Sequence, residues 1–156
     1  METITFTRVA IVIFTALTIS SCATPPPAQQ AIQKSKVISK SFDATWANII
    51  SVFAENNIGI QTLEKDSGII VAETEYTTPE NLDLYATCQS GPLETILTNK
   101  AKFNVFSRKI SDTETRVQVN AVYNRTTLGQ LSNQTFNRIC VSNGTLEQKI
   151  LDAAAQ

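Results

Sequence analysis

Apolar and polar side chains alternate along two neighbouring stretches in the second half of the chain. Phe103 and Val105 take every second position along residues 101–108. The same period of two returns over residues 116–124, after a polar stretch at residues 111–114. Because successive side chains of a strand point to opposite faces, this pattern predicts a hairpin with one face on the core and one in water.

A second pattern, with apolar residues three and four positions apart, predicts two helices. The first begins at Asp43, whose carboxylate would cap the helix by accepting from the free amides of its first turn. Its apolar stripe consists of Trp46, Ile49, Ile50, Phe53 and Ala54. Asn56-Asn57 and Gly59 end this helix, and a short strand over residues 37–42 precedes it. The second predicted helix covers residues 145–154.

Two further segments complete the predicted order of elements. Residues 58–76 predict a hairpin, with Gly68 in the left-handed conformation that its tight turn needs. Periodicity is lost over residues 77–99, which we expect to form a long loop with a short helical turn at residues 93–97. Residues 136–141 predict another strand.

The order is therefore strand, helix, two strands, loop, three strands and helix. An antiparallel sheet that buries one face under two helices accommodates this order most simply. The sequence predicts an α+β fold with two helices packed on one face of the sheet.

The N-terminal apolar run at residues 9–19 is too short for a spanning helix, which needs about 20 residues. It fits the hydrophobic region of a secretory signal peptide. The residues that follow, Ile19-Ser20-Ser21-Cys22, resemble the bacterial lipobox. This resemblance implies removal of residues 1–21, acylation of Cys22 and, because Ala23 rather than an aspartate follows, an address at the outer membrane of a Gram-negative bacterium. The alternatives are a simple signal peptide with an incidental cysteine and a buried core helix.

After the signal peptide, we expect a tether followed by one domain. Residues 22–35 would form the lipidated cysteine and a tether rich in proline and glutamine, reaching at most roughly 40 Å. Residues 36–156 would form a single periplasmic domain. Loss of the signal removes Arg8 and Glu2, so the net charge of −1 does not change. This balance supports neither a nucleic-acid partner nor a peripheral membrane surface, and we expect membrane contact through the acyl chains.

Two cysteines remain once Cys22 is acylated. In an oxidising compartment Cys88 and Cys140 are expected to form a disulfide. Closing a loop of this length would stabilise the fold by about 4 kcal/mol at the upper end. Two free thiols or a metal site are the alternatives, but the sequence has no histidine, so one chain cannot assemble a tetrahedral Cys/His zinc site.

Residues for common catalytic chemistry are scarce. The absence of histidine excludes the usual serine or cysteine triad, and no glycine-rich phosphate loop occurs. Glu73 and Glu75 lie on one face of a predicted strand, as they would on a solvated surface. We therefore expect no catalytic residue, no cofactor and no metal site.

Residues 41–72 resemble a unit found in envelope lipoproteins. The resemblance rests on F-D-x-x-W at the start of the helix, an aliphatic strand, D-S-G and an aliphatic return strand. It is similar to the helix-grip domains of BamC, the lipoprotein subunit of the β-barrel assembly machinery, and of uncharacterised lipoproteins that share the unit. The pair Cys88 and Cys140 is not part of that pattern.

The expected function is that of a non-catalytic binding or assembly module for an envelope protein complex. The partner would be another envelope protein, meeting residues 77–99 through Tyr85 and Leu93 or adding to a free strand edge. A periplasmic domain that binds a small molecule or lipid in a cleft between helix and sheet is the alternative. An enzyme is a third and less favoured class.

Overall fold

The computed structural model of the chain describes residues 31–156. These residues form one compact unit, Ala31–Gln156. The predicted signal peptide, Cys22 and most of the tether lie outside the described residues. Within the described part, no helix has the length and apolarity needed to cross a bilayer.

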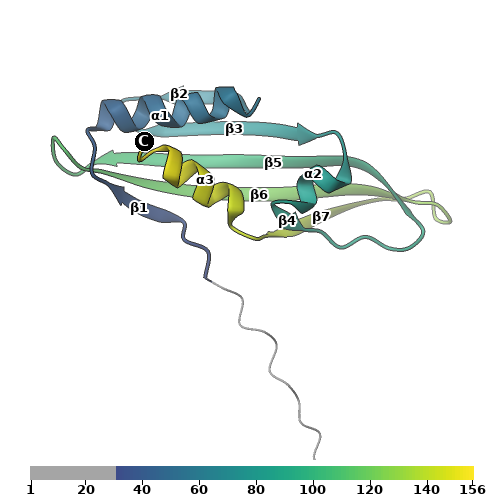
Figure 1. Cartoon of the computed structure of the whole chain (residues 1–156). Helices are drawn as coiled ribbons and strands as arrows, with labels where there is room; N and C mark the ends of the chain where they lie inside the picture. Colours follow the sequence, from purple (N-terminus) through teal and green to yellow (C-terminus); the bar gives the residue numbers. More distant parts are fainter. Residues whose placement is uncertain (1–30) are drawn as a thin grey trace, which may run out of the picture. The chain divides into compact units, whose positions relative to one another are not determined.

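The domain is an α+β fold with an antiparallel sheet, as predicted, and the sheet has seven strands where the sequence predicted six. The elements in chain order are β1 (Ser35–Ile38), α1 (Phe42–Glu55), β2 (Gly59–Glu64), β3 (Ile69–Tyr76), α2 (Pro79–Asp83), β4 (Ala86–Thr87), β5 (Glu94–Lys109), β6 (Thr115–Gly129), β7 (Thr135–Ser142) and α3 (Thr145–Ala153). Strands are ordered β2-β3-β5-β6-β7-β4 in the sheet, and β1 pairs with β6 (Figure 1).

One face of the sheet forms the core. The register places Phe103 of β5 between neighbours on β3 and β6 whose side chains are also buried or partly buried. Phe53 of α1 packs on Phe103 with ring centroids 6.1 Å apart, and Phe103 meets Tyr123 of β6 edge to face at 6.2 Å. Since α3 also reaches Tyr123, through Glu147, α1 and α3 lie on the same face of the sheet (Figure 1). We call the opposite side the open face.

The β2–β3 turn confirms the predicted role of Gly68. Its φ is +71°, in the left-handed region that favours glycine. A Cβ atom at this position would lie 1.9 Å from the carbonyl oxygen of Ser107, and the Ser107 amide donates to the Gly68 carbonyl at 2.8 Å. The turn can therefore press against β5 only because residue 68 lacks a side chain.

Two predictions for the first elements need correction. The first strand is β1, Ser35–Ile38, rather than residues 37–42. Helix α1 is capped by Ser41, whose Oγ accepts from the Ala44 amide at 3.4 Å, and not by Asp43. Asp43 lies in the first turn instead, where its carboxylate complements the helix dipole and pairs with Lys65 at 2.9 Å.

The region predicted as a long loop is more ordered than its sequence suggests. Residues 77–93 contain α2 and β4, and β5 begins at Glu94, so the predicted helical turn at residues 93–97 is wrong. A register shift between Ile96 and Thr98 interrupts the pairing of β5 with β6. This irregularity breaks the period of two and hides the first half of the strand.

Strands β1 and β7 share one edge of β6. β1 pairs with residues 115–118 and β7 with residues 123–128. The chain before β1 is held to the same edge, because the Val119 amide donates to the Lys34 carbonyl at 2.8 Å. The folded domain therefore begins before residue 36, the predicted boundary.

Two phenylalanines on opposite faces of β5 test this arrangement. Phe103 is fully buried, whereas Phe106 is 44% exposed on the open face. We expect Phe103→Ala to lower the free energy of unfolding by about 3–5 kcal/mol because it leaves a cavity, and Phe106→Ala by about 1 kcal/mol or less. Urea unfolding measures both, and equal losses would contradict the assignment of faces.

Candidate functional site

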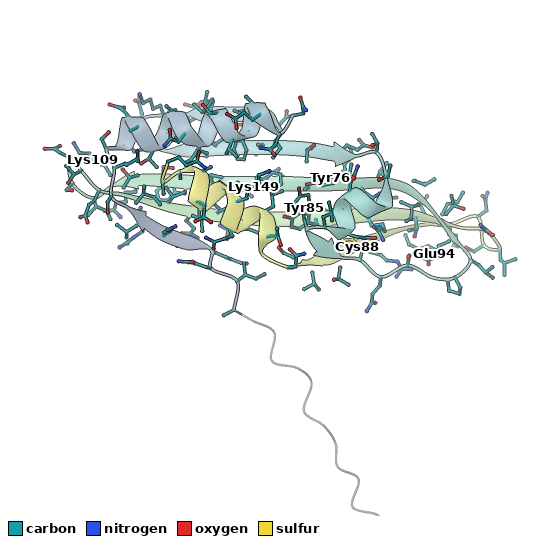
Figure 2. All side chains as sticks on the ribbon, in the orientation of Figure 1. Tyr76, Tyr85, Cys88, Glu94, Lys109 and Lys149 are labelled. Carbon is teal, nitrogen blue, oxygen red and sulfur yellow. A yellow bond between two sulfur atoms is a disulfide. The ribbon has the colours of Figure 1, made fainter. Side chains whose placement is uncertain are left out.

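The segment between β3 and β5, residues 77–93, crosses the core face at one end of the sheet, and we call it the strap. Leu82 and Ala86 of the strap are buried in the core. Tyr85 packs against Tyr76 of β3 with the two rings tilted and their centroids 5.8 Å apart (Figure 2). The Asn143 amide and its side chain also donate to strap carbonyls, both at 2.9 Å. The strap is thus packed into the domain through its middle, residues 82–86.

The predicted disulfide is present. Cys88 of the strap, directly after β4, is bonded to Cys140 of β7, with Cα atoms 4.5 Å apart and a sequence separation of 52. It joins the strap to β7 beside β4, which pairs with the end of β7. The two cysteines therefore fix an edge of the sheet.

A buried arginine of β6 binds the strap through a hydrogen-bonded ion pair. The Arg125 guanidinium donates to Asp83 of α2 at 2.8 Å and to Asn99 of β5 at 2.8 Å. The Arg125 side chain is almost completely buried, so removal of either acceptor would leave a poorly compensated charge. The signal in the sequence was the phase of the alternation, because residue 125 continues the core-facing series of residues 117–123.

A second buried polar group anchors the last helix. Glu147 of α3 is fully buried and accepts from the Ser142 hydroxyl at 2.6 Å and from the Tyr123 hydroxyl at 3.4 Å. Burial, and next the Glu147 carboxylate, raises the pKa of Tyr123 above its ordinary value. Tyr123 therefore stays a neutral donor, and α3 is tied to both β6 and the end of β7.

The two residues predicted to contact a partner differ in their surroundings. Tyr85 is half-buried against Tyr76 and anchors the strap. Leu93 is 51% exposed, and its carbonyl accepts from the Gln130 amide at 2.9 Å. Partner contact through this pair stays a prediction, with only Leu93 presenting a largely exposed side chain.

The open face carries an apolar cluster on β6 and β7 that the sequence analysis did not single out. Val122, Ile139 and Val141 are exposed there, and Ile139 is the most exposed of them at 80%. We call these residues the β7 patch. Within the described chain, β4 pairs with Val141 and Ser142 alone, so the outer edge of β7 before Val141 has no strand beside it. The signal in the sequence was the apolar pair Ile139 and Val141 on alternate positions of a predicted strand.

A groove lies between the two longer helices, α1 and α3. A groove of about 650 Å³ separates α1 from α3, and polar side chains including Asn48, Glu55 and Lys149 line it. Lys149 bridges the groove by donating to Asn56 at 2.6 Å. The predicted cleft between helix and sheet stays a prediction, because this groove is bounded by helices on both sides.

Glu94 closes the far end of the sheet. Its carboxylate accepts from the Thr127 hydroxyl at 2.8 Å and from the Arg138 guanidinium. A hydrogen bond from the Gly91 backbone, followed by the one from Thr127 and then Arg138, holds the pKa of Glu94 below its ordinary value. In Figure 2 Glu94 and Lys109 mark opposite ends of the sheet.

The disulfide gives a first prediction for this region. Cys88→Ser with Cys140→Ser should lower the free energy of unfolding by up to about 4 kcal/mol, because the unfolded chain regains the freedom of a long loop. Urea unfolding of the oxidised protein and the variant measures the loss, with reduced wild type as the control. An unchanged midpoint, or two free thiols by mass analysis of the protein isolated without reductant, would contradict a structural role.

Glu94 gives a second prediction, with a defined sign. A carboxyl whose pKa is lower in the folded state adds stability that is complete above its unfolded pKa of about 4.3 and lost as the pH falls through the folded value. We expect Glu94→Gln to be less stable than wild type at neutral pH and to lose less stability on acidification. Urea midpoints at a series of pH values measure this, and parallel profiles would contradict it.

No protein-family model matches this chain, and a search of curated protein sequences found no significant match.

Proposed function

We propose that this protein is a non-catalytic lipoprotein, anchored at Cys22 in the outer membrane, whose periplasmic domain binds another envelope protein as an assembly module. The lipobox at residues 19–22 supports the anchor. The resemblance to a helix-grip unit over residues 41–72 is compatible with α1 and α3 on one face of an antiparallel sheet.

The observation that carries the binding role is the outer edge of β7. Its backbone groups before Val141 face no strand of the described chain, and Ile139 beside them is 80% exposed. An unpaired edge is a template for an added strand. A partner segment in extended conformation would gain main-chain hydrogen bonds from the edge and specificity from Ile139 and Val141.

The surroundings of β7 keep this edge in place before a partner arrives. The disulfide at Cys140 joins β7 to the strap, and Ser142 at its end is bonded to buried Glu147. Arg138 on the opposite side of the strand is paired with Glu94. A surface ordered in advance loses less conformational entropy on binding, which favours an edge built in this way.

Photo-crosslinking in intact cells tests the proposal. A photoreactive amino acid at Ile139 should give one discrete protein adduct, and the same amino acid at Leu131 should not. Leu131 is the matched control because it is also apolar and 86% exposed, but lies outside the β7 patch.

Two further variants decide between outcomes. Val141→Lys should abolish the Ile139 adduct by placing a charge in the docking strand. Cys22→Ser should remove the protein from the outer-membrane fraction and reduce the adduct. Equal adducts from Ile139 and Leu131 would refute docking at β7, and an outer-membrane location unaffected by Cys22→Ser would refute the lipid anchor.

A further inference from the structure

The open face has a second region of unusual composition, at the end of the sheet opposite Glu94. The register places Ile69 opposite Phe106, Arg108 opposite Arg116, and Arg116 opposite Val37. All these side chains are exposed. We call Val37, Ile69, Phe106, Arg108 and Arg116 the basic–apolar patch.

The pair Arg108 and Arg116 is unfavourable as it stands. Like charges directly opposite each other on neighbouring strands destabilise a sheet. Within residues 31–156 neither arginine makes an ion pair. Glu64 lies opposite Ile69 in the register and is likewise unpaired with either arginine in the described part of the chain.

The same sheet shows how such a pair is neutralised when its role is structural. Arg125 of β6 lies opposite Arg138 of β7. Each has a carboxylate partner, Asp83 for Arg125 and Glu94 for Arg138. The fold therefore supplies an anion to each arginine of one cross-strand pair and leaves both arginines of the other pair facing solvent.

Apolar side chains surround the unpaired arginines. Phe106 is 44% exposed next to Arg108 along β5, and Val37 is 45% exposed opposite Arg116. A notch of about 570 Å³ beside them is lined by Phe106 and Arg108, by Lys65 and Lys109, and by Asp43 and Asp66. Lys65 and Lys109 are paired with Asp43 and Asp112, so among the described residues the free positive charge beside the apolar side chains is that of the two arginines. Exposed apolar groups among cations suit the boundary between anionic headgroups and acyl chains of a bilayer.

The position of the chain outside the described residues favours the same surface. Eight residues separate Cys22 from Ala31, so a lipid anchor at Cys22 would hold Ala31 within about 30 Å of the bilayer. The chain then runs directly into β1, which carries Val37 of the patch. A short tether raises the effective concentration of the patch at the membrane surface, so a weak affinity for headgroups is enough to dock the domain.

We propose that the basic–apolar patch docks the domain onto anionic phospholipid headgroups of the membrane that holds its anchor. This inference rests on the proposed lipid anchor. It departs from the expectation of membrane contact through the acyl chains alone, because net charge does not show that Arg108 and Arg116 lie side by side. It adds that the domain lies with one end of its open face against the bilayer, while the edge of β7 at the other end is left for a protein partner.

Reconstitution of the mature acylated protein in vesicles tests the docking. Gln118, opposite Phe106 in the register, is replaced by cysteine and labelled with a fluorophore. A matched label at Ser51 marks exposed α1. Spin-labelled headgroups should quench the label at Gln118 several-fold more in vesicles of equal phosphatidylcholine and phosphatidylglycerol than in phosphatidylcholine alone. The label at Ser51 should respond equally in both.

Charge variants assign the effect. Arg108→Gln with Arg116→Gln should abolish the extra quenching at Gln118. Lys100→Gln with Lys102→Gln removes the same charge from β5 outside the patch and should preserve it. Urea midpoints check that both variants fold.

The outcomes separate the two proposals. Co-flotation with neutral vesicles reports the anchor alone, so its absence would overturn the anchor and this inference together. Co-flotation with equal quenching in both vesicle types, or equal loss in both charge variants, would overturn the docking alone. A photoreactive amino acid at Gln118 in intact cells tests the alternative of a protein partner. If it gave a protein adduct that the arginine variant lost, while that variant kept the extra quenching in vesicles, the patch would be reassigned to an acidic protein partner.

Discussion

The aromatic cluster of Phe53, Phe103 and Tyr123 is the contact on which the remaining architecture depends. It joins α1 to β5 and β5 to β6 on one face of the sheet. Because α1 and α3 both cover this face, the apolar residues on the other face are left without a cover from any described element. The exposure of Phe106 and Ile139 is thus a direct consequence of a one-sided core.

Around this apolar centre, buried polar groups decide where the smaller elements lie. Arg125 aligns α2 through Asp83, and Glu147 aligns α3 through Ser142 and Tyr123. Burial of such groups adds little net stability, since the desolvation cost offsets much of the attraction. Their hydrogen bonds are directional, however, and an apolar core alone would not fix the position of so short a helix as α2.

The sequence was sufficient for the fold class and for the later hairpin, because alternation on Phe103 and its neighbours is strong and local. It was also sufficient for the pairing of Cys88 with Cys140, because the predicted acylation of Cys22 leaves no third thiol to compete. It failed where two local signals compete. Ser41 and Asp43 are both good capping residues, and only the geometry of the chain leaving β1 selects Ser41.

Other features depend on register, which a single sequence does not specify. The first half of β5 was missed because the irregularity after Ile96 destroys the period of two. The sequence also did not predict the two arginine pairs. The register of β5, β6 and β7 places Arg108 opposite Arg116 and Arg125 opposite Arg138. Strand β1 and strand β7 lie end to end along one side of β6. Traction between residue 31 and β7 would therefore pass through the backbone hydrogen bonds that β6 makes along this side.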